Sequence, residues 1–117
     1  INDVARVKIA MQSDDFNEEV LDKDMKLMFY RIAQEQLNNI LKHSKATKAT
    51  IELNTTKIYS LLAIEDNGVG FASDSVSAGI GLRNIRNRVS YYSGNVNIIS
   101  APGNGCRLEV IVPLNQS

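Results

Sequence analysis

The sequence predicts a two-layer α/β domain, in which helices cover one face of a mixed sheet whose neighbouring strands are mostly antiparallel. Three observations lead to this prediction. The chain has 117 residues, so residues 1–117 are expected to form one domain with its own core. Its composition, 44% hydrophobic and 22% charged, is typical of globular proteins rather than disordered or coiled-coil chains. Its local patterns follow one another in the order β–α–β–β–α–β–β.

The first half of the chain contains few residues that interrupt regular structure, since all of its glycines lie at or after position 68. Alternating side chains over 4–11 predict a strand. A helical pattern then runs from about Met25 to His43, and Asp22 and Asp24 suit the positive end of this helix. Its predicted apolar stripe has the spacing i, i+4, i+8, i+11 and consists of Phe29, Ala33, Leu37 and Ile40.

The remaining elements are a hairpin, a second helix and a closing pair of strands. Residues 48–54 and 57–65 are rich in β-forming side chains and are separated by Thr55-Thr56, which predicts a hairpin. After a small, polar stretch, a second helix is expected to begin at Leu82 and to end at Gly94 in the C′ position. Two strands, 95–100 and 106–112, are expected to complete the sheet.

Charge and cysteine content exclude several function classes. Thirteen Lys+Arg balance thirteen Asp+Glu, so neither nucleic acid nor an acidic membrane is expected as the main partner. A single cysteine, Cys106, excludes an internal disulfide framework and a multi-cysteine zinc site. No run is apolar for long enough to span a bilayer, and no signal peptide opens the chain. Because the first residue is Ile1 rather than Met, the chain is expected to be a domain excised from a longer protein.

The first patch with a chemical signature lies on the long helix. Glu35, Asn38, Asn39 and Lys42 have the spacing i, i+3, i+4 and i+7, so they share one face opposite Ala33 and Leu37. Such a face is usually a solvated one. Asparagine is, however, a poor residue inside a helix, because its amide competes for backbone hydrogen bonds. Two adjacent asparagines therefore suggest a function.

Two glycine-containing patches follow. Glu65-Asp66-Asn67-Gly68-Val69-Gly70 places an acidic residue at the end of an apolar strand; it is also compatible with a plain Asn-Gly turn. Gly79-Ile80-Gly81-Leu82 is expected to lie directly before the second helix, where glycines allow close approach and free N–H groups attract anions. An anion there would explain Arg83 and Arg86, whereas Arg88 is interpreted as an ordinary solvated arginine.

In this order, the three patches resemble the motifs of the catalytic ATP-binding domain of bacterial sensor histidine kinases. That domain belongs to the superfamily that includes gyrase, MutL and heat-shock chaperone ATPases. YRIAQEQLNNILKHSKAT resembles the N box, EDNGVGF the G1 box, GIGLRNIRNRV the G2 box, and SAPGNGCRLEVIVPL the closing strand pair. The wording of the N and G2 boxes is most similar to NarX/DesK-like kinases, whose usual partners are LuxR-type response regulators. The resemblance implies the Bergerat fold.

The resemblance also implies roles for individual residues. Asn39 falls at the position that binds magnesium, and Lys42 and His43 would face the phosphates. Asp66 would accept a hydrogen bond from the adenine amino group. The positions that would leave room beside the base or contact the phosphates are Gly68, Gly70, Gly79, Gly81 and Leu82, with residues 71–78 as a lid. Glu35 is assigned a catalytic role, as a base, a water-positioning group or a support for the magnesium shell.

Two residues need separate consideration. Family members commonly carry a threonine near position 106 that helps to bind adenine, and Cys106 replaces it here. A thiol is a weak donor, so the adenine site would be looser; a buried structural cysteine is the expected role. The only histidine, His43, has no partners for a zinc site. A phosphate contact and packing at the helix end, where a histidine suits the dipole, both remain open for it.

The resemblance implies a function for the whole chain. The domain would bind Mg·ATP and present the γ-phosphate to a histidine on a separate helical dimerisation domain, for transfer to a response regulator. It would act in the cytoplasm without itself contacting a membrane. An anti-sigma-factor serine kinase and a non-catalytic module switched by ATP are the alternatives on the same fold.

Overall fold

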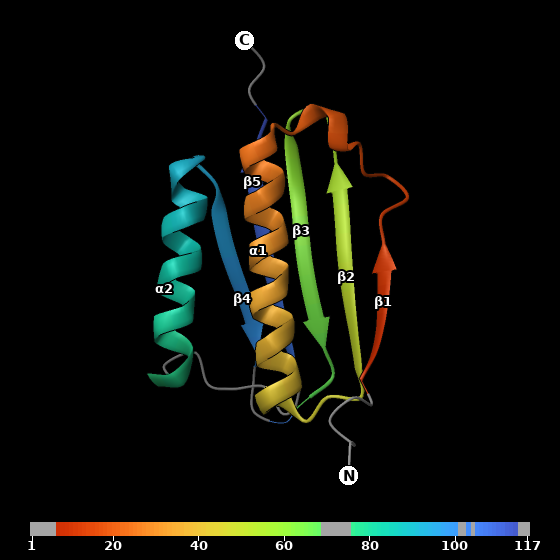
Figure 1. Cartoon of the computed structure of the whole chain (residues 1–117), viewed down its shortest axis with the longest axis vertical. Coiled ribbons are helices and arrows are strands. Elements are labelled where there is room, and N and C mark those ends of the chain that lie inside the picture. Colours follow the sequence, from red (N-terminus) through yellow and green to blue (C-terminus); the bar gives the residue numbers. More distant parts are fainter. Residues whose placement is uncertain (1–6, 69–75, 101–102, 104, 115–117) are drawn as a thin grey trace.

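A computed structural model of the chain describes residues 7–68, 76–100, 103 and 105–114, with only the backbone of 43–44 and 76–82. The order of elements is the predicted one (Figure 1). The strands and helices are β1 (Lys8–Gln12), α1 (Lys23–Asn39), β2 (Lys48–Thr55), β3 (Tyr59–Asp66), α2 (Val76–Tyr91), β4 (Asn95–Ser100) and β5 (Cys106–Pro113). A 3₁₀ turn, Glu18–Val20, precedes α1, and a π-helical turn, Ile40–Ser44, follows it.

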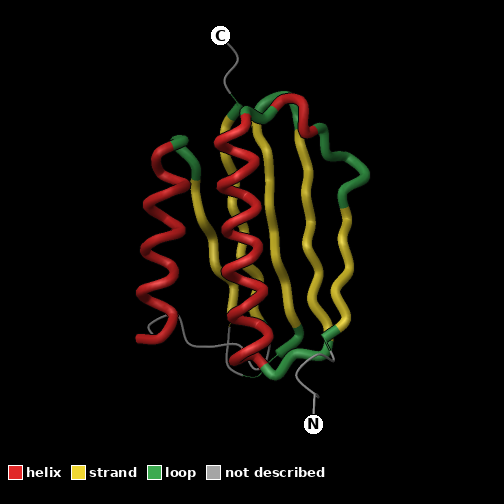
Figure 2. The backbone as a smooth tube through the Cα atoms, viewed as in Figure 1, coloured by secondary structure: helices red, strands yellow, loops and turns green. Residues whose placement is uncertain are grey.

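The strands form one sheet in the order β1-β2-β3-β5-β4. Only β1 and β2 are parallel; the other three neighbouring pairs are antiparallel. Both helices lie on the same face of this sheet (Figure 2). These findings confirm the predicted mixed, mostly antiparallel sheet with helices on one face. The four strands from β2 to β5 lie within about two residues of their predicted bounds, whereas the predicted strand over 4–11 is described only from Lys8, and residues 1–6 lie outside the described residues.

The core lies between the helices and the sheet. Ile32 of α1 and Val89 of α2 are fully buried there, against β3 and β5 side chains such as Leu62 and Val110. The α1 residues that point into the core are Met25, Met28, Phe29 and Ile32. The predicted stripe is therefore only partly right, because Ala33 and Leu37 are half-buried at its edge.

The N-terminal end of α1 agrees with the sequence, and its C-terminal end does not. Asp22 is the N-cap, and its carboxylate accepts a hydrogen bond from the Met25 N–H at 2.8 Å. The α-helix ends at Asn39 rather than His43, and the chain continues as the π turn up to Lys45, which has a φ of 56°. Ile40, in this turn, is buried at 2% exposure. The α-helical spacing thus predicted the burial of Ile40 correctly but not the rare π turn that begins there.

The start of α2 corrects a prediction about the third patch. The helix begins at Val76, so Gly79 and Gly81 lie within it rather than before it. Each glycine costs about 1 kcal/mol of helix propensity, which is why the sequence alone favoured a start at Leu82. Arg83 and Arg86 consequently lie in the middle of α2, and Arg88 lies in its last turn, where a cation suits the dipole.

The end of α2 corrects a second prediction. Ser93, and not Gly94, adopts the left-handed conformation, with a φ of 61°. The Ser93 N–H donates to the Ser90 carbonyl at 2.9 Å and the Gly94 N–H to the Val89 carbonyl at 3.0 Å, which is a Schellman motif with Gly94 at C″. A Cβ on Gly94 would lie 2.6 Å from Val89 Cγ1 and 2.7 Å from the Ile111 carbonyl oxygen. Glycine is required at 94 by this close packing and not by its φ.

The described helices have one further property. Within residues 7–68 and 76–100, no helix is long and apolar enough to cross a membrane.

Candidate functional site

The elements that carry the three sequence patches meet at one end of the molecule. The C-terminal end of α1, the C-terminal end of β3 and the N-terminal end of α2 all lie at the same end of the sheet (Figure 1). This arrangement follows from the topology, because α1 and β3 run in the same direction and α2 runs back. Residues that are up to fifty positions apart in the sequence are thereby gathered at a single location.

Asp66 is the buried acidic residue of this end. It is the last residue of β3 and is 6% exposed, although most aspartates lie at the surface. Its Oδ1 accepts a hydrogen bond from the Gly68 N–H at 2.8 Å, and Gly68 is itself buried. Burial raises the pKa of the Asp66 carboxyl; the Gly68 N–H lowers it, and the neighbouring Glu65 raises it. The carboxylate has lone pairs beyond the one used by Gly68, so it can accept from a ligand.

Cys106 and Ser100 lie beside Asp66 on the two next strands. Cys106 pairs with Asp66 across β3 and β5, and Ser100 pairs with Cys106 across β4 and β5. Cys106 is a free cysteine, 6% exposed. Burial raises the pKa of its thiol and so does the Asp66 carboxylate, whereas a hydrogen bond with Ser100 lowers it. Cys106 is therefore a buried neutral thiol next to the carboxylate, as the sequence suggested for a structural cysteine.

Gly105 sets the position of the Asp66 backbone. It has a φ of +75°, and a Cβ on it would collide with the Asp66 carbonyl oxygen. The Gly105 carbonyl accepts the Ser100 hydroxyl at 3.0 Å. The loop that enters β5 thus packs directly against the end of β3, and only glycine permits this approach.

Asn67 has a structural role that the sequence did not reveal. Its side-chain oxygen accepts from the N–H groups of Thr47 and Lys48 at 2.9 Å and 3.0 Å, and its amide donates to the Thr47 hydroxyl at 3.0 Å. Its own N–H donates to the Lys48 carbonyl at 3.2 Å. Asn67 therefore ties the end of β3 to the segment that follows α1, rather than forming a hairpin turn with Gly68. An asparagine whose flanking residues fit no hairpin was the only signal in the sequence.

The polar face of α1 leads into the same end of the sheet. Glu35 is half-buried, and Asn38, Asn39 and Lys42 are exposed. Glu35 and Asn39 are four residues apart within α1, so they do share a face, whereas Lys42 lies in the π turn, where α-helical spacing no longer applies. The backbone of His43 is in the same turn, and its side chain lies outside the described residues.

This polar face fits magnesium only together with a nucleotide. Among the described residues no group of three or more His, Cys, Asp and Glu side chains could hold a metal ion. Magnesium commonly takes one or two protein oxygens and completes its shell with phosphates and waters. The Glu35 carboxylate and the Asn39 amide oxygen lie at neighbouring positions on one surface of α1. They could supply these one or two protein oxygens, but they could not complete a magnesium shell without phosphates and water.

The second glycine patch contributes less to the described structure. Gly79, Gly81 and Leu82 are part of the α2 backbone, and the proposed lid at 71–78 is described only from Val76, where it is helical. Gly70 and residues 71–75 lie outside the described residues. Arg86 donates to the Val96 carbonyl at 3.2 Å, so it links α2 to β4, a role that requires no anion.

The chain has relatives among known proteins. The model of the family described as "Histidine kinase-, DNA gyrase B-, and HSP90-like ATPase" matches residues 25–116. The chain is 43% identical over 103 residues to the sensor protein VraS of Staphylococcus saprophyticus, covering 87% of the chain and 30% of that protein. It is 38% identical over 111 residues to VraS of Staphylococcus aureus, covering 94% of the chain and 31% of that protein. The chain thus spans about a third of these curated relatives.

Two solved structures share the fold. The blue-light activated histidine kinase of Erythrobacter litoralis superposes with a TM-score of 0.76 at 19% identity, over 96% of this chain and 39% of that one. The ATP-binding domain of PrrB from Mycobacterium tuberculosis superposes with a TM-score of 0.64 at 20% identity, over 77% of this chain and 69% of that one. At these identities the likeness concerns the fold alone.

Proposed function

Because the chain belongs to the family of histidine kinase-, DNA gyrase B- and HSP90-like ATPases, we propose that it is the ATP-binding catalytic domain of a two-component sensor histidine kinase. Residues 1–117 would act as a single unit in the cytoplasm. The observation that carries the proposal is the buried Asp66 at the end of β3, within the 92-residue family match over 25–116 and at the same end of the sheet as the polar face of α1.

Asp66 would select adenine. Its carboxylate would accept a hydrogen bond from the exocyclic amino group of adenine. Guanine presents a carbonyl oxygen at the equivalent position and would be repelled by the carboxylate. Buried carboxylates give strong discrimination of this kind, because a wrong partner leaves them unpaired. Gly68, buried against Asp66, and Gly70 would leave room beside the base.

The phosphates would lie over the polar face of α1 and the start of α2. Asn39 would hold Mg²⁺ together with the phosphates and water, Glu35 would support that shell or orient the attacking group, and Lys42 and His43 would face the phosphates. Gly79, Gly81 and Leu82 would contribute through the α2 backbone. Bound magnesium would supply charge neutralisation at the β- and γ-phosphates, as in other phosphoryl transfers.

The domain itself would mainly position reactants. A histidine nitrogen on a separate helical dimerisation domain would attack the γ-phosphorus, the bond to the β,γ-bridging oxygen would break, and ADP would leave. Alignment and charge neutralisation account for most of the acceleration in such transfers. The sequences of the N and G2 boxes support a NarX/DesK-like assignment, in which a LuxR-type response regulator would be the final acceptor of the phosphoryl group.

Calorimetric titration with a non-hydrolysable ATP analogue, with and without Mg²⁺, tests the proposal. We expect saturable binding that Asp66→Asn abolishes, and a magnesium dependence that Asn39→Ala removes. Asn38→Ala is the matched control, since Asn38 is also exposed and the family resemblance assigns magnesium to Asn39 and not to Asn38. Equal binding of the GTP analogue, or no binding by the folded chain, would contradict the proposed site. Phosphorylation of a supplied dimerisation domain then separates a histidine kinase from an ATP-driven switch.

A further inference from the structure

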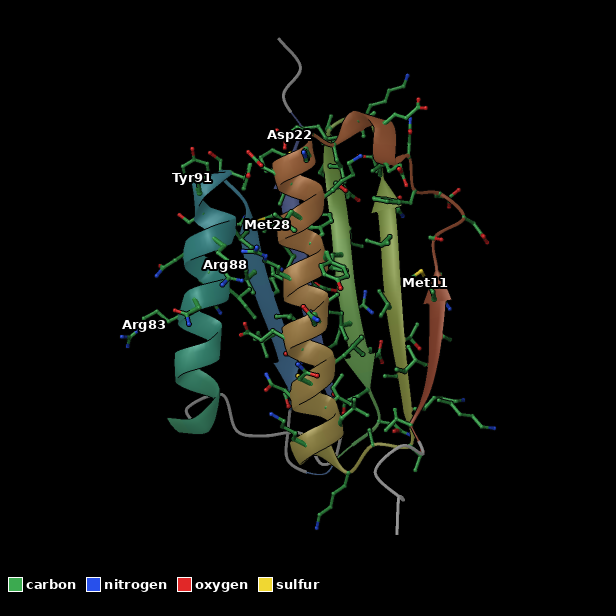
Figure 3. The ribbon with its side chains drawn as sticks, in the orientation of Figure 1. Met11, Asp22, Met28, Arg83, Arg88 and Tyr91 are labelled. Carbon is green, nitrogen blue, oxygen red and sulfur yellow. The ribbon has the colours of Figure 1, made fainter. Side chains whose placement is uncertain are left out.

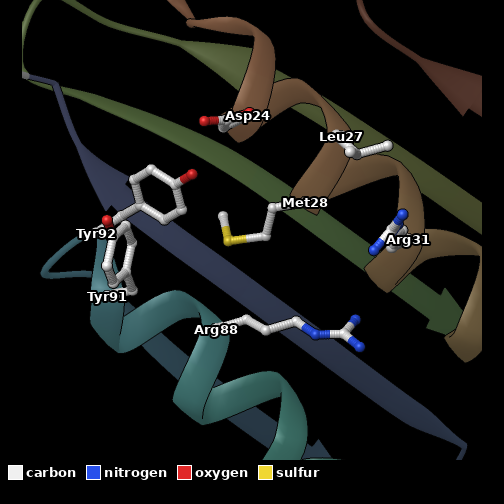
Figure 4. A pocket seen from close by; sticks show the side chains of 7 residues that line it. All are labelled: Asp24, Leu27, Met28, Arg31, Arg88, Tyr91 and Tyr92. Carbon is white, nitrogen blue, oxygen red and sulfur yellow. The ribbon is translucent and has the colours of Figure 1, made fainter.

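A groove of about 350 Å³ lies between α1 and α2, away from the candidate nucleotide site. It is formed by the N-terminal half of α1 and the C-terminal half of α2, whereas the nucleotide site lies at the other end of both helices. Side chains from both helices line it (Figure 4). None of these residues has a part in the proposed binding of ATP.

One end of the groove is cationic. Arg31 of α1 and Arg88 of α2 both line it, and their guanidinium groups point toward the same end (Figure 4). Neither arginine has an ion-pair or hydrogen-bond partner among the described residues. Arg83, on the same helix, points away from α1 (Figure 3). Two guanidinium groups at the same end of the groove, one from each helix, are suited to a carboxylate, which a guanidinium can bind through parallel N–H donors.

The other end is aromatic and acidic. Tyr91 is 84% exposed, and its ring packs edge-on against Tyr92, with centroids 5.2 Å apart and an interplanar angle of 82°. Met28 of α1, 6% exposed, lies beside these rings (Figure 4). Asp24 lies beside Tyr92; burial raises the pKa of the Tyr92 hydroxyl, and the Asp24 carboxylate raises it further. An exposed aromatic platform of this kind is typical of a binding surface.

The charges and the apolar floor are spaced by helical turns. Asp24, Met28 and Arg31 lie on one side of α1 at i, i+4 and i+7. An acidic, an apolar and a basic side chain therefore follow one another along the helix, about one turn or 5 Å apart. Arg88 precedes Tyr91 on the antiparallel α2, so both helices place their arginine at the same end. A third helix that lies in the groove would present side chains with the same periodicity.

We propose that this groove docks an amphipathic α-helix of a protein partner, which places an apolar side chain over Met28, a carboxylate between Arg31 and Arg88, and a basic group near Asp24. The partner helix must therefore carry a basic residue at i, an apolar residue at i+3 or i+4, and an acidic residue at i+7. Complementary charges at both ends fix the direction of the helix, and the exposed Tyr91 covers its apolar side chain.

The test uses the whole chain labelled with ¹⁵N and stapled 18-residue helical peptides. The first peptide carries Lys, Leu and Glu at i, i+4 and i+7 on an Ala/Gln background; the second has Gln and the third has Lys in place of Glu. We expect saturable shifts confined to residues 24–31 and 88–92 with the first peptide. The second and third peptides should bind at least tenfold more weakly, and added salt should weaken the first.

Variants of the protein make the test specific. The double variant Arg31→Gln/Arg88→Gln, and separately Tyr91→Ala, should lower the affinity for the first peptide at least tenfold. Lys26→Gln and Tyr30→Ala are the matched controls, because both residues are exposed on α1 outside the groove, and they should leave the affinity unchanged. All of these side chains are exposed, so the variants are expected to fold.

Four results would overturn the proposal. The first two are equal binding of the acidic and basic peptides, and no shift in the groove with any peptide. The third is saturation of the same signals by benzoate alone with the same affinity. The fourth is movement of the same signals when the protein alone is diluted. Benzoate binding would indicate a site for small organic anions, and the dilution effect a second copy of this chain. Nucleotide is absent from every sample, so the outcome is independent of the proposed ATP site.

Discussion

Asp66 and Cys106 face each other across β3 and β5, and both side chains are 6% exposed. A carboxylate and a thiol are thus buried side by side. Burial raises the pKa of the Cys106 thiol, and the charge of the Asp66 carboxylate raises it further. The thiol can donate only weakly to a ligand or to the carboxylate. The chemistry of the proposed adenine pocket therefore depends on the residue at position 106 as well as on Asp66.

Cys106→Thr should tighten binding of an ATP analogue by about 3- to 10-fold, because a hydroxyl replaces a weak donor and a net hydrogen bond contributes about 0.5–1.5 kcal/mol. Cys106→Val is the matched control, since valine has the shape of threonine without its hydroxyl, and it should not tighten binding. Calorimetry measures both. Equal gains for threonine and valine would mean that packing, and not the hydroxyl, limits affinity.

Asp66→Asn should separate stability from binding. Burial raises the pKa of Asp66 above its ordinary 3.8. The protonated form is thus favoured by folding, and its contribution to stability is present below about pH 3.8 and is lost as the pH rises through the raised value. We expect the free energy of unfolding of the wild type, relative to Asp66→Asn, to fall between pH 4 and pH 7, while the variant loses nucleotide binding.

Urea unfolding across this pH range measures the difference. A constant difference between the two proteins would contradict the raised pKa. Marked destabilisation of Asp66→Asn at pH 7 would show instead that the charged form is needed for folding. Protonation of Asp66 should also weaken nucleotide binding at low pH, because a protonated carboxyl has lost an acceptor for the adenine amino group.

The sequence predicted those features that depend on neighbouring residues. Alternation, β-forming composition and helical spacing predicted the order of the described strands and α-helices, and the strand–Asp–Gly pattern correctly placed Asp66 at a strand end. Features that depend on distant residues were missed. Gly94 is required because Val89 and Ile111 approach it from two other elements, and the bonds from Asn67 to Thr47 and Lys48 join segments about twenty residues apart.

Arg107 forms another long-range arrangement, with three glutamates from three strands. Its guanidinium contacts Glu109, Glu65 and Glu52 at 2.7, 3.0 and 3.2 Å. These hydrogen bonds raise the pKa of Arg107, that with Glu109 most of all, although burial lowers it. Removing the one cation would leave three carboxylates close together.

Arg107→Ala should lower the free energy of unfolding by about 1.5–3 kcal/mol at pH 7, the usual range for hydrogen bonds to charged groups. The loss should be smaller at high salt, which screens the repulsion among the three carboxylates. Arg107→Lys keeps the charge but cannot reach three carboxylates in one plane, so it should recover only part of the loss. Urea unfolding at low and at high salt measures the difference. A loss for Arg107→Ala that is the same at both salt concentrations would show that packing, not charge, is responsible.

Ser93 and Gly94 offer a paired prediction, in which adjacent substitutions have opposite effects. Ser93→Gly should stabilise the chain by about 0.5–1 kcal/mol, because Ser93 occupies a left-handed conformation with a φ of 61° that glycine adopts without strain. Gly94→Ala should destabilise it by about 1–3 kcal/mol, because the new methyl group would collide with Val89 Cγ1 and with the Ile111 carbonyl oxygen, which belongs to the backbone and cannot rotate away. Thermal unfolding of the two variants measures both effects. If glycine were needed at 94 for its φ, as the sequence suggested, Ser93→Gly would bring no gain; opposite signs would establish that the helix reverses at Ser93 and that Gly94 serves the contact between α2 and β5.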